Sequence, residues 1–558
     1  MGSVRQRNHD EDNNWVDNLL GRAKGFIGFS SCPSDESDGT VKDVANSIEC
    51  QPIKSDDVSD KRCAVTYTDL VAPPAATTWL VTPGALVAII VALLSISLSG
   101  IMWLTSAYDN AILKLVSIRD DIDMVFDLWR LPPTRPTLSV YPFHYKNYEA
   151  VIAGSELPNV EEKGPFIFRE KTERININFY GNSTVSFQEM KNITHDDIHS
   201  RGSLKENITT PNVPLIVFLK KASGFYFLEQ KFSNAWFNTL KAEPFHTVTI
   251  NDLMWGYEDD FFKTLSSIFV SLGYPKPKPF GFLAKRKGVH HDIFTERTGA
   301  DDLNSIGSIT RVNGAETIGA WGNTTCDLLQ GSDGTIFPAK SVRNGETLYV
   351  FSKEMCRRIP IFFNSTQESK DGFPVQRYDV DPNMFNFSVK NKENECYVLD
   401  GEYPPSGSFL TSPCQGDAPI YFTFPHFLHA GEELKNSISG LRPDPEKHRS
   451  YIKIHKELGI SMKVRTRFQL NVMLKKSNYI AQSSRLKAEK LILPIAWMDY
   501  DSGDLPEDFV NTVYHLTFTV KWVEVLLRWT LSLCAIASVI YLAMGIRRNY
   551  RFRIPRII

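Results

Sequence analysis

The feature that most constrains this chain is an uncharged apolar run of twenty residues, 84–103, inside a longer uncharged segment at 70–108. An α-helix rises about 1.5 Å per residue, so the run can cross the roughly 30 Å hydrocarbon core of a bilayer. A buried core helix of a soluble protein is the alternative, but such helices rarely extend over about eighteen uncharged residues. The run therefore predicts a membrane-spanning helix over residues 80–106.

A second apolar run, residues 529–546, lies close to the C-terminus and predicts a second span over 526–546. Five arginines follow within the last twelve residues: Arg547, Arg548, Arg551, Arg553 and Arg556. Because basic residues favour the cytosolic side of a membrane, residues 547–558 are predicted to be a basic cytosolic tail. Two crossings return the N-terminus to the cytosol as well, with the first span acting as an uncleaved anchor.

Six N-glycosylation sequons lie between the two predicted spans, and neither tail contains one. Their asparagines are Asn182, Asn192, Asn207, Asn323, Asn364 and Asn386. A single sequon is a weak motif, but the distribution of all six agrees with one lumenal or extracellular region. We therefore expect residues 107–525 to form a glycosylated ectodomain.

Composition separates the N-terminal tail from the rest of the chain. The chain has 558 residues and a formal net charge of −2, which argues against nucleic acid as a partner. Its first 78 residues carry eight Lys or Arg against thirteen Asp or Glu and have no periodic apolar stripe. Residues 1–79 are therefore predicted to be a disordered cytosolic tail.

Four of the eight cysteines, Cys326, Cys356, Cys396 and Cys414, fall in the predicted ectodomain. An even number in an oxidising compartment favours two disulfides over four free thiols. Four cysteines allow three connectivities, and their spacing does not choose between them.

Helical spacing appears in two parts of the ectodomain. Residues 109–128 predict a helix that rises from the membrane, and residues 214–270 predict several helices. Within the second part, five apolar residues recur every three or four positions: Phe225, Leu228, Phe232, Trp236 and Leu240. Such a face is normally core, whereas an exposed one would mark a binding surface.

The clearest strand is residues 462–474, where apolar and polar side chains alternate. Its apolar face carries Met462, Val464, Phe468, Leu470, Val472 and Leu474. At about 3.3 Å per residue the strand is about 40 Å long, enough to traverse a domain. Its apolar face lines either a packed core or an apolar cavity, as in barrels that enclose lipid.

Motifs of enzymatic chemistry are missing from the sequence. It contains no nucleophile elbow, no phosphate-binding Gly-rich loop, no His-Glu-x-x-His and no Cys-x-x-Cys. We therefore expect neither an enzyme nor a cofactor. His290-His-Asp292 has the chemistry of a metal site, but adjacent loop residues rarely converge on one ion.

Seven segments, in this order between two terminal spans, carry a family resemblance. They are Gly164-Pro-Phe-Ile-Phe-Arg-Glu170, Leu253-Met-Trp-Gly-Tyr257 and residues 323–338, 356–360, 424–430, 440–451 and 493–498. With them the chain resembles the class B scavenger receptor family. The resemblance implies an α+β fold, with a large antiparallel β-barrel-like ectodomain, an apical helical bundle near 214–270, an internal apolar tunnel and two transmembrane helices. It also implies disulfides between Cys326 and Cys396 and between Cys356 and Cys414.

The function implied by the resemblance is a receptor that binds lipids, lipoproteins or other anionic or hydrophobic ligands at its apex. Lipid would then pass through the tunnel to the membrane. Its partners would be membrane lipids, fatty acids, sterols, lipoprotein particles and protein ligands. The alternative is adhesion, phagocytic recognition or protein trafficking without lipid conduction.

The resemblance also suggests where such a receptor would act. Candidate ligand-binding residues at the apex are Lys220, Lys221, Lys231, Lys241, Lys263, Phe225, Phe232 and Trp236. Candidate tunnel-lining residues are Val464, Phe468, Leu470, Val472 and Leu474. We expect the protein in the plasma membrane, with an endosomal or lysosomal membrane as the alternative.

Overall fold

The computed structural model describes residues 80, 82–120, 123–224, 226–387, 392–399 and 401–551. The predicted N-terminal tail, residues 1–79, lies outside this part of the chain, as do residues 552–558. The predictions made for those residues therefore stay predictions.

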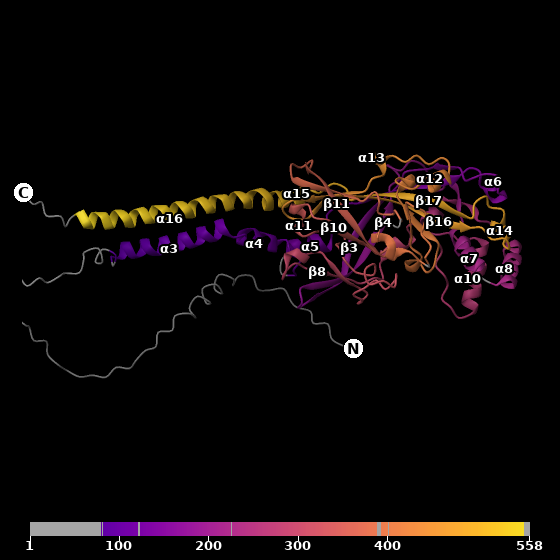
Figure 1. Ribbon diagram of the computed structural model, residues 1–558, viewed down its shortest axis with the longest axis horizontal. Coiled ribbons are helices and arrows are strands. Elements are labelled where there is room, and N and C mark those ends of the chain that lie inside the picture. The colour runs from indigo at the N-terminus through magenta and orange to yellow at the C-terminus, as the bar shows by residue number, and fades with distance from the viewer. Residues whose placement is uncertain are drawn as a thin grey trace, which may run out of the picture. The chain divides into compact units, whose positions relative to one another are not determined.

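Two long apolar helices, α3 (Pro83–Leu104) and α16 (Val520–Arg551), run side by side (Figure 1). Between them, the Ser99 and Ser532 hydroxyls lie 2.9 Å apart, and the Trp103 indole donates to Ser532 at 3.1 Å. Both helices are long and apolar enough to cross a membrane, and most of their apolar surface is left unburied. That exposure is expected of helices whose solvent is lipid, and the protein is a membrane protein with two spans.

A cluster of charges joins the two spans at the end nearer the barrel. The Glu524 carboxylate is fully buried, lies 2.6 Å from the Lys521 ammonium and also pairs with Arg528. Lys521 reaches Asp109 at 3.7 Å, and the Arg528 guanidinium lies 5.5 Å from the centre of the Trp103 ring. The cluster satisfies these charges where the helices leave the predicted hydrocarbon region.

The segment after α3 forms two helices, α4 (Ala107–Leu115) and α5 (Asp123–Arg130), so the prediction of one helix over 109–128 is wrong. The chain breaks where it reaches the barrel. There the Ile118 amide donates to the Thr298 carbonyl at 3.0 Å, and the Ile118 side chain is buried. Contacts with the barrel therefore outweigh local helical periodicity.

A nearly closed antiparallel barrel forms the body of the ectodomain. Within the described residues, eleven strands are paired in the order β10-β11-β12-β15-β16-β17-β1-β3-β4-β8-β9. Their bounds are β1 (Thr137–Tyr145), β3 (Phe166–Tyr180), β4 (Thr184–His195), β8 (Phe294–Arg297), β9 (Ile309–Val312), β10 (Leu348–Ser352), β11 (Arg357–Glu368), β12 (Pro374–Val380), β15 (Tyr451–His455), β16 (Ser461–Lys475) and β17 (Lys490–Asp501). The α+β fold class with a barrel-like ectodomain is thus confirmed.

The segment 329–333 bridges the two end strands of this sheet. The Ile309 amide donates to the Gly331 carbonyl at 2.9 Å, and the Ser332 amide donates to the Tyr349 carbonyl at 2.9 Å. Gly331 has a φ of +110°, and a Cβ there would lie 2.5 Å from the Tyr349 carbonyl oxygen. Only glycine therefore fits this close approach, which seals the seam of the barrel.

Smaller elements surround the barrel. The short strands are β2 (Val160–Glu162), β5 (Asn207–Pro211), β6 (Phe245–Thr249), β7 (Gly288–Val289), β13 (Ser408–Leu410) and β14 (Ile420–Thr423). The helices are α6 (Tyr148–Ala153), α7 (Val213–Ser223), α8 (Phe227–Thr239), α9 (Ile250–Trp255), α10 (Asp260–Ser271), α11 (Ala339–Asn344), α12 (Glu432–Asn436), α13 (Pro445–His448), α14 (Ala481–Ser484) and α15 (Glu507–Tyr514). Helices α7, α8 and α10 lie at the end of the barrel opposite α3 and α16 (Figure 1).

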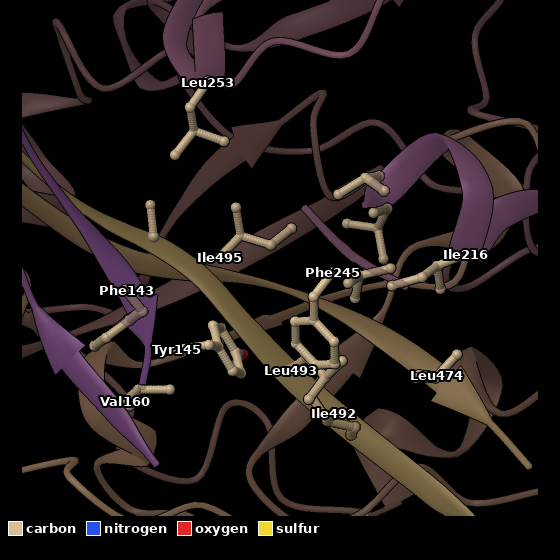
Figure 2. Close-up of a cluster of buried hydrophobic side chains, with 14 of the residues drawn as sticks. Phe143, Tyr145, Val160, Ile216, Phe245, Leu253, Leu474, Ile492, Leu493 and Ile495 are labelled. Carbon is tan, nitrogen blue, oxygen red and sulfur yellow. The ribbon is translucent and has the colours of Figure 1, made fainter. Parts of the chain in front are cut away.

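The largest apolar cluster lies between these apical helices and the barrel wall (Figure 2). Figure 2 shows Tyr145 of β1 beside Leu493 of β17 and Phe245 of β6, and Phe143 and Ile495 belong to the same cluster. All five side chains are at most 2 % exposed. Each such side chain contributes about 1.5–3 kcal/mol through burial, so the cluster fixes the apical helices on the barrel.

Replacing Gly440 by alanine tests a close approach between the 424–450 segment and the barrel. Gly440 has a φ of +92°, and a Cβ there would lie 1.9 Å from the Val160 carbonyl oxygen. Gly314, with a φ of +83° and no atom near its Cβ position, is the matched control. We expect Gly440→Ala to cost about 2 kcal/mol more than Gly314→Ala in the free energy of unfolding, measured by chemical denaturation. Equal losses would contradict the packing described.

Candidate functional site

The apical helices pack on one another through aromatic rings. The Phe218 ring of α7 lies 5.6 Å from Trp236 and 5.7 Å from Phe237 of α8, and 5.8 Å from Phe261 of α10. Trp236 is therefore a packing residue that is half-buried in this cluster, rather than a side chain free to receive ligand.

The outer side of α8 is unusually apolar. Leu228 is 67 % exposed and Phe232 is 77 % exposed, so the interpretation of this stripe as core is wrong for both residues. The buried side of α8 instead carries Gln230, Ser233 and Phe237. Exposure of large apolar side chains at this density is typical of a binding surface in a soluble region.

We call the exposed apolar residues on α8 and next to α14 the apical patch. Its members are Tyr226, Phe227, Leu228, Phe232 and Tyr479. A second exposed apolar group lies at the end of α10 and just beyond it: Ile268, Phe269, Val270, Leu272 and Tyr274. Neighbouring helices at the distal end therefore both present apolar surface.

Lys231 places a positive charge on the apical patch. Its ammonium lies 5.6 Å from the centre of the Phe227 ring and 5.9 Å from that of Tyr479, and the two rings meet edge to face at 5.2 Å. The α14 segment is tied to α8 because the Ala481 amide donates to the Asn234 side chain at 2.8 Å. The patch thus combines apolar area with one oriented cation.

The other candidate apical residues differ in their surroundings. Lys220 donates to the Asp417 carbonyl at 2.8 Å, and Lys263 pairs with Asp260 at 3.4 Å. Lys221 and Lys241 are exposed. Phe225 lies outside the described residues.

The candidate tunnel-lining residues share one face of β16 but enter different clusters. Val472 and Leu474 are fully buried in the main cluster, in which Figure 2 labels Leu474 at the end of β16. Phe468 packs 6.1 Å from Phe385 in a second cluster. Val464 packs on a third cluster around Ile452, and Leu470 is half-buried. Their role as the wall of an open path stays a prediction.

The opposite face of β16 is also buried, which the alternation of polar residues did not predict. Arg467 and Asp499 are 4 % and 6 % exposed, and the Arg467 Nε lies 3.1 Å from an Asp499 oxygen. Gln469 and Asn471 are fully buried and hydrogen-bonded to each other at 2.8 Å. The sequence did contain a signal for this buried charge. Arginines occupy alternate positions of β16, aspartates occupy alternate positions at the end of β17, and strand pairing places them opposite one another.

A histidine pair extends this buried polar layer. The His426 Nε2 lies 2.6 Å from a Glu162 oxygen, to which the Trp497 indole also donates at 2.8 Å. The His448 ring stacks on His426 at 4.6 Å. Burial, with His426 beside it, lowers the pKa of His448 to about 4, so the ring is neutral at pH 7.

A second layer of charged side chains is buried on β3, β4 and β8. On β3 it lies on the same side of the strand as the buried Phe166 and Phe168. Arg174, 3 % exposed, pairs with Asp333 at 2.5 Å, and the Trp129 indole donates to Glu296 at 2.7 Å. Burial, with Asp333 beside it, raises the pKa of Glu296 to about 8.

The same layer continues toward β17. The Arg286 Nε lies 2.7 Å from Glu170, and its guanidinium lies 5.6 Å from the centre of the Tyr500 ring. Burial raises the pKa of Tyr500. Although burial opposes it, the positive charges of Lys191 and Arg174 lower the pKa of Glu189 to about 2. The barrel is therefore apolar next to the apical helices and contains paired charges along β3 and β4.

The four ectodomain cysteines form two disulfides. Cys326 is joined to Cys396 and Cys356 to Cys414, the pairing that the family resemblance implies. Among the six sequon asparagines, Asn182, Asn192, Asn207, Asn323 and Asn364 are exposed and Asn386 is half-buried. Their glycosylation stays a prediction. Among the described residues, no group of three His, Cys, Asp or Glu side chains is arranged to hold a metal ion.

Comparison with known proteins agrees with this architecture. Residues 86–546 match the model of the CD36 family. The chain is 28 % identical over 417 residues to scavenger receptor class B member 1 of Bos taurus, covering 74 % of this chain and 79 % of the relative. It is 29 % identical over 402 residues to lysosome membrane protein 2 of Rattus norvegicus, covering 70 % and 81 %. Since the family match extends from the first span to the second, the chain belongs to the CD36 family of non-enzymatic scavenger receptors.

Proposed function

We propose that this receptor captures lipids, lipoproteins or other anionic and hydrophobic ligands on its apical patch and passes lipid through the barrel to the membrane. The observation that carries the proposal is the exposed apolar surface of α8, with Leu228 at 67 % and Phe232 at 77 %. Transfer of apolar surface from water to such a site gains about 0.8 kcal/mol per buried methylene.

Lys231 supports an anionic headgroup as part of the ligand. Its ammonium lies against two aromatic rings, so it presents positive charge next to apolar area. A fatty acid or phospholipid has the same juxtaposition of charge and chain.

The double substitution Leu228→Ser with Phe232→Ser tests the patch. Each side chain buried on binding is worth about 1.5–3 kcal/mol, so we expect fatty-acid-containing anionic vesicles to bind at least about tenfold more weakly. Ile198→Ser, at an 88 % exposed position on the turn after β4, is the matched control. Equal binding by all three proteins would exclude the patch as the capture site.

Leu470→Trp separates conduction from recognition. Leu470 is half-buried on the predicted tunnel face, so a larger side chain there would narrow an apolar path. Loss of fluorescent fatty-acid uptake with vesicle binding retained is the expected result. Unchanged uptake would favour the alternative, an adhesion, phagocytic or protein-trafficking receptor without conduction.

The cellular site belongs to the same proposal. We propose the plasma membrane with both termini in the cytosol, as the arginines after residue 546 favour. Similarity to both a scavenger receptor and a lysosome membrane protein keeps an endosomal or lysosomal membrane as the alternative. Surface biotinylation of cells that express the full chain separates the two.

A further inference from the structure

A groove of about 380 Å³ runs beside the hairpin that joins β3 to β4. Residues from β4, β8, β9 and the barrel-closing segment 329–331 line it. Those used in the argument are Asn182, Thr295, Ser308, Thr310, Leu329 and Gln330. Thr295 alternates with the buried Glu296 on β8, so the groove lies on the outer side of the barrel wall.

Asn182, one of the predicted glycosylation sites, stands on the rim of the groove at a fixed position. It is the middle residue of the hairpin loop between Tyr180 and Thr184, and its amide oxygen accepts from the Thr184 hydroxyl at 2.7 Å. The Thr298 amide and hydroxyl both donate to the Ser183 carbonyl at 3.0 Å. The hairpin tip is therefore bound to the end of β8, and the remaining amide nitrogen of Asn182 is the atom to which a glycan attaches.

The charges that line the groove are already paired. Arg297 lies 3.4 Å from Asp301, and Arg311 lies 2.6 Å from Glu316. Each arginine is balanced by its own carboxylate, so the groove has no unbalanced charge that would attract an ion. The groove is therefore poorly suited to a charged ligand.

The remaining lining suits a neutral ligand that has both hydroxyl and apolar parts. Thr295 and Ser308 offer hydroxyls that can donate and accept. The Thr310 hydroxyl donates to the Thr295 carbonyl and the Gln330 amide oxygen accepts from Arg358, which leaves an acceptor on Thr310 and an amide donor on Gln330. The buried Leu329 side chain, 8 % exposed, offers apolar area among them. N-acetylglucosamine has complementary groups, since it carries ring hydroxyls, an amide and an acetamido methyl group.

We propose that the first sugars of an N-glycan on Asn182 lie in this groove and cover the seam of the barrel. The glycan is tethered at the rim, so it reaches the groove at high effective concentration. It would span β4, β8, β9 and the segment 329–331, the region through which the sheet closes. Asn192, exposed on β4, is not among the residues that line the groove.

Enzymatic deglycosylation of the folded full-length protein tests this inference. Cleavage by a peptide N-glycosidase leaves an aspartate, so mass spectrometry of peptides can follow release at Asn182 and Asn192 separately. In the native protein we expect release at Asn182 to be about tenfold slower than at Asn192, which corresponds to about 1.4 kcal/mol of protection. After denaturation the two rates should agree.

Two variants make the result specific to the groove. Thr310→Trp places a large side chain in the groove and should bring release at Asn182 close to the rate at Asn192. Met190→Trp, at an exposed position on β4 two residues before Asn192 and outside its sequon, is the control and should change neither rate. Equal native rates at the two sites, no glycan on Asn182, or continued protection in Thr310→Trp would each overturn the inference, whether or not the receptor conducts lipid.

Discussion

Replacing Asp499 by alanine is expected to lower the free energy of unfolding by about 3–5 kcal/mol, because it leaves a buried guanidinium without its counter-charge. Arg467 is 4 % exposed and lies 3.1 Å from Asp499, which also binds Arg465 at 2.8 Å. Water cannot replace the carboxylate at such a site. Chemical denaturation of the full-length protein in detergent measures the loss.

Lys490→Ala is the matched control for this experiment. Lys490 begins the same strand and pairs with Glu402 at 2.7 Å, but the two side chains are 44 % and 73 % exposed. Exposed ion pairs contribute about 0–1 kcal/mol, so the control should lose little stability. If Asp499→Ala lost no more than the control, the buried pair would not hold β16 and β17 together.

Acidification from pH 7 to pH 4 is expected to destabilise the ectodomain, because buried neutral histidines resist protonation. Burial lowers the pKa of His448, His455 and His246 from 6.5 to about 4. Between pH 7 and pH 4 these histidines bind protons in the unfolded chain but stay neutral in the folded protein. The free energy of unfolding therefore decreases as the pH falls. For the almost fully buried His448 and His455 the loss reaches about 3 kcal/mol each.

Glu296 has the opposite effect at higher pH, because it makes the free energy of unfolding decrease as the pH rises. Its pKa is raised from 4.5 to about 8, so the folded protein keeps a proton that the unfolded chain releases. The stability it contributes is present below pH 4.5 and is lost as the pH rises toward 8. Together with the histidines, this places the expected maximum of stability between about pH 6 and 7.

Thermal denaturation across the pH range checks both sides of this maximum. Glu296→Gln retains an acceptor for the Trp129 indole and should gain about 4 kcal/mol at pH 8. His448→Gln should flatten the decline between pH 6.5 and 4, while His291→Gln, at an exposed position, should not. A flat profile in the wild-type protein would show that these groups titrate normally.

Much of the organisation was predictable because it depends on properties of contiguous sequence. The two spans follow from the length of residues 84–103 and 529–546, and helices α3 and α16 cover both runs. The long strand at 462–474 was predicted from its period of two, and β16 covers it. The barrel itself came from the family resemblance, since no local pattern encodes the order in which eleven strands pair.

The candidate site was less predictable, because exposure of a side chain depends on what packs against it. Leu228 and Phe232 share a helical face with Trp236, yet only Trp236 meets the rings of Phe218 and Phe261. Periodicity identified the stripe but not which of its residues would be covered. The apical patch appears only once α7 and α10 occupy the other side of α8.

The sequence by itself determined where the chain meets the membrane, because about twenty uncharged residues have few other stable environments. It also places the six sequons and four of the eight cysteines between the two spans. The tertiary structure alone decided that both faces of β16 are buried over most of residues 467–474, and that Glu170, Arg174 and Glu296 are buried. The physical reason is that a strand's alternation specifies two faces, whereas only the neighbouring strands and loops decide whether water reaches either of them.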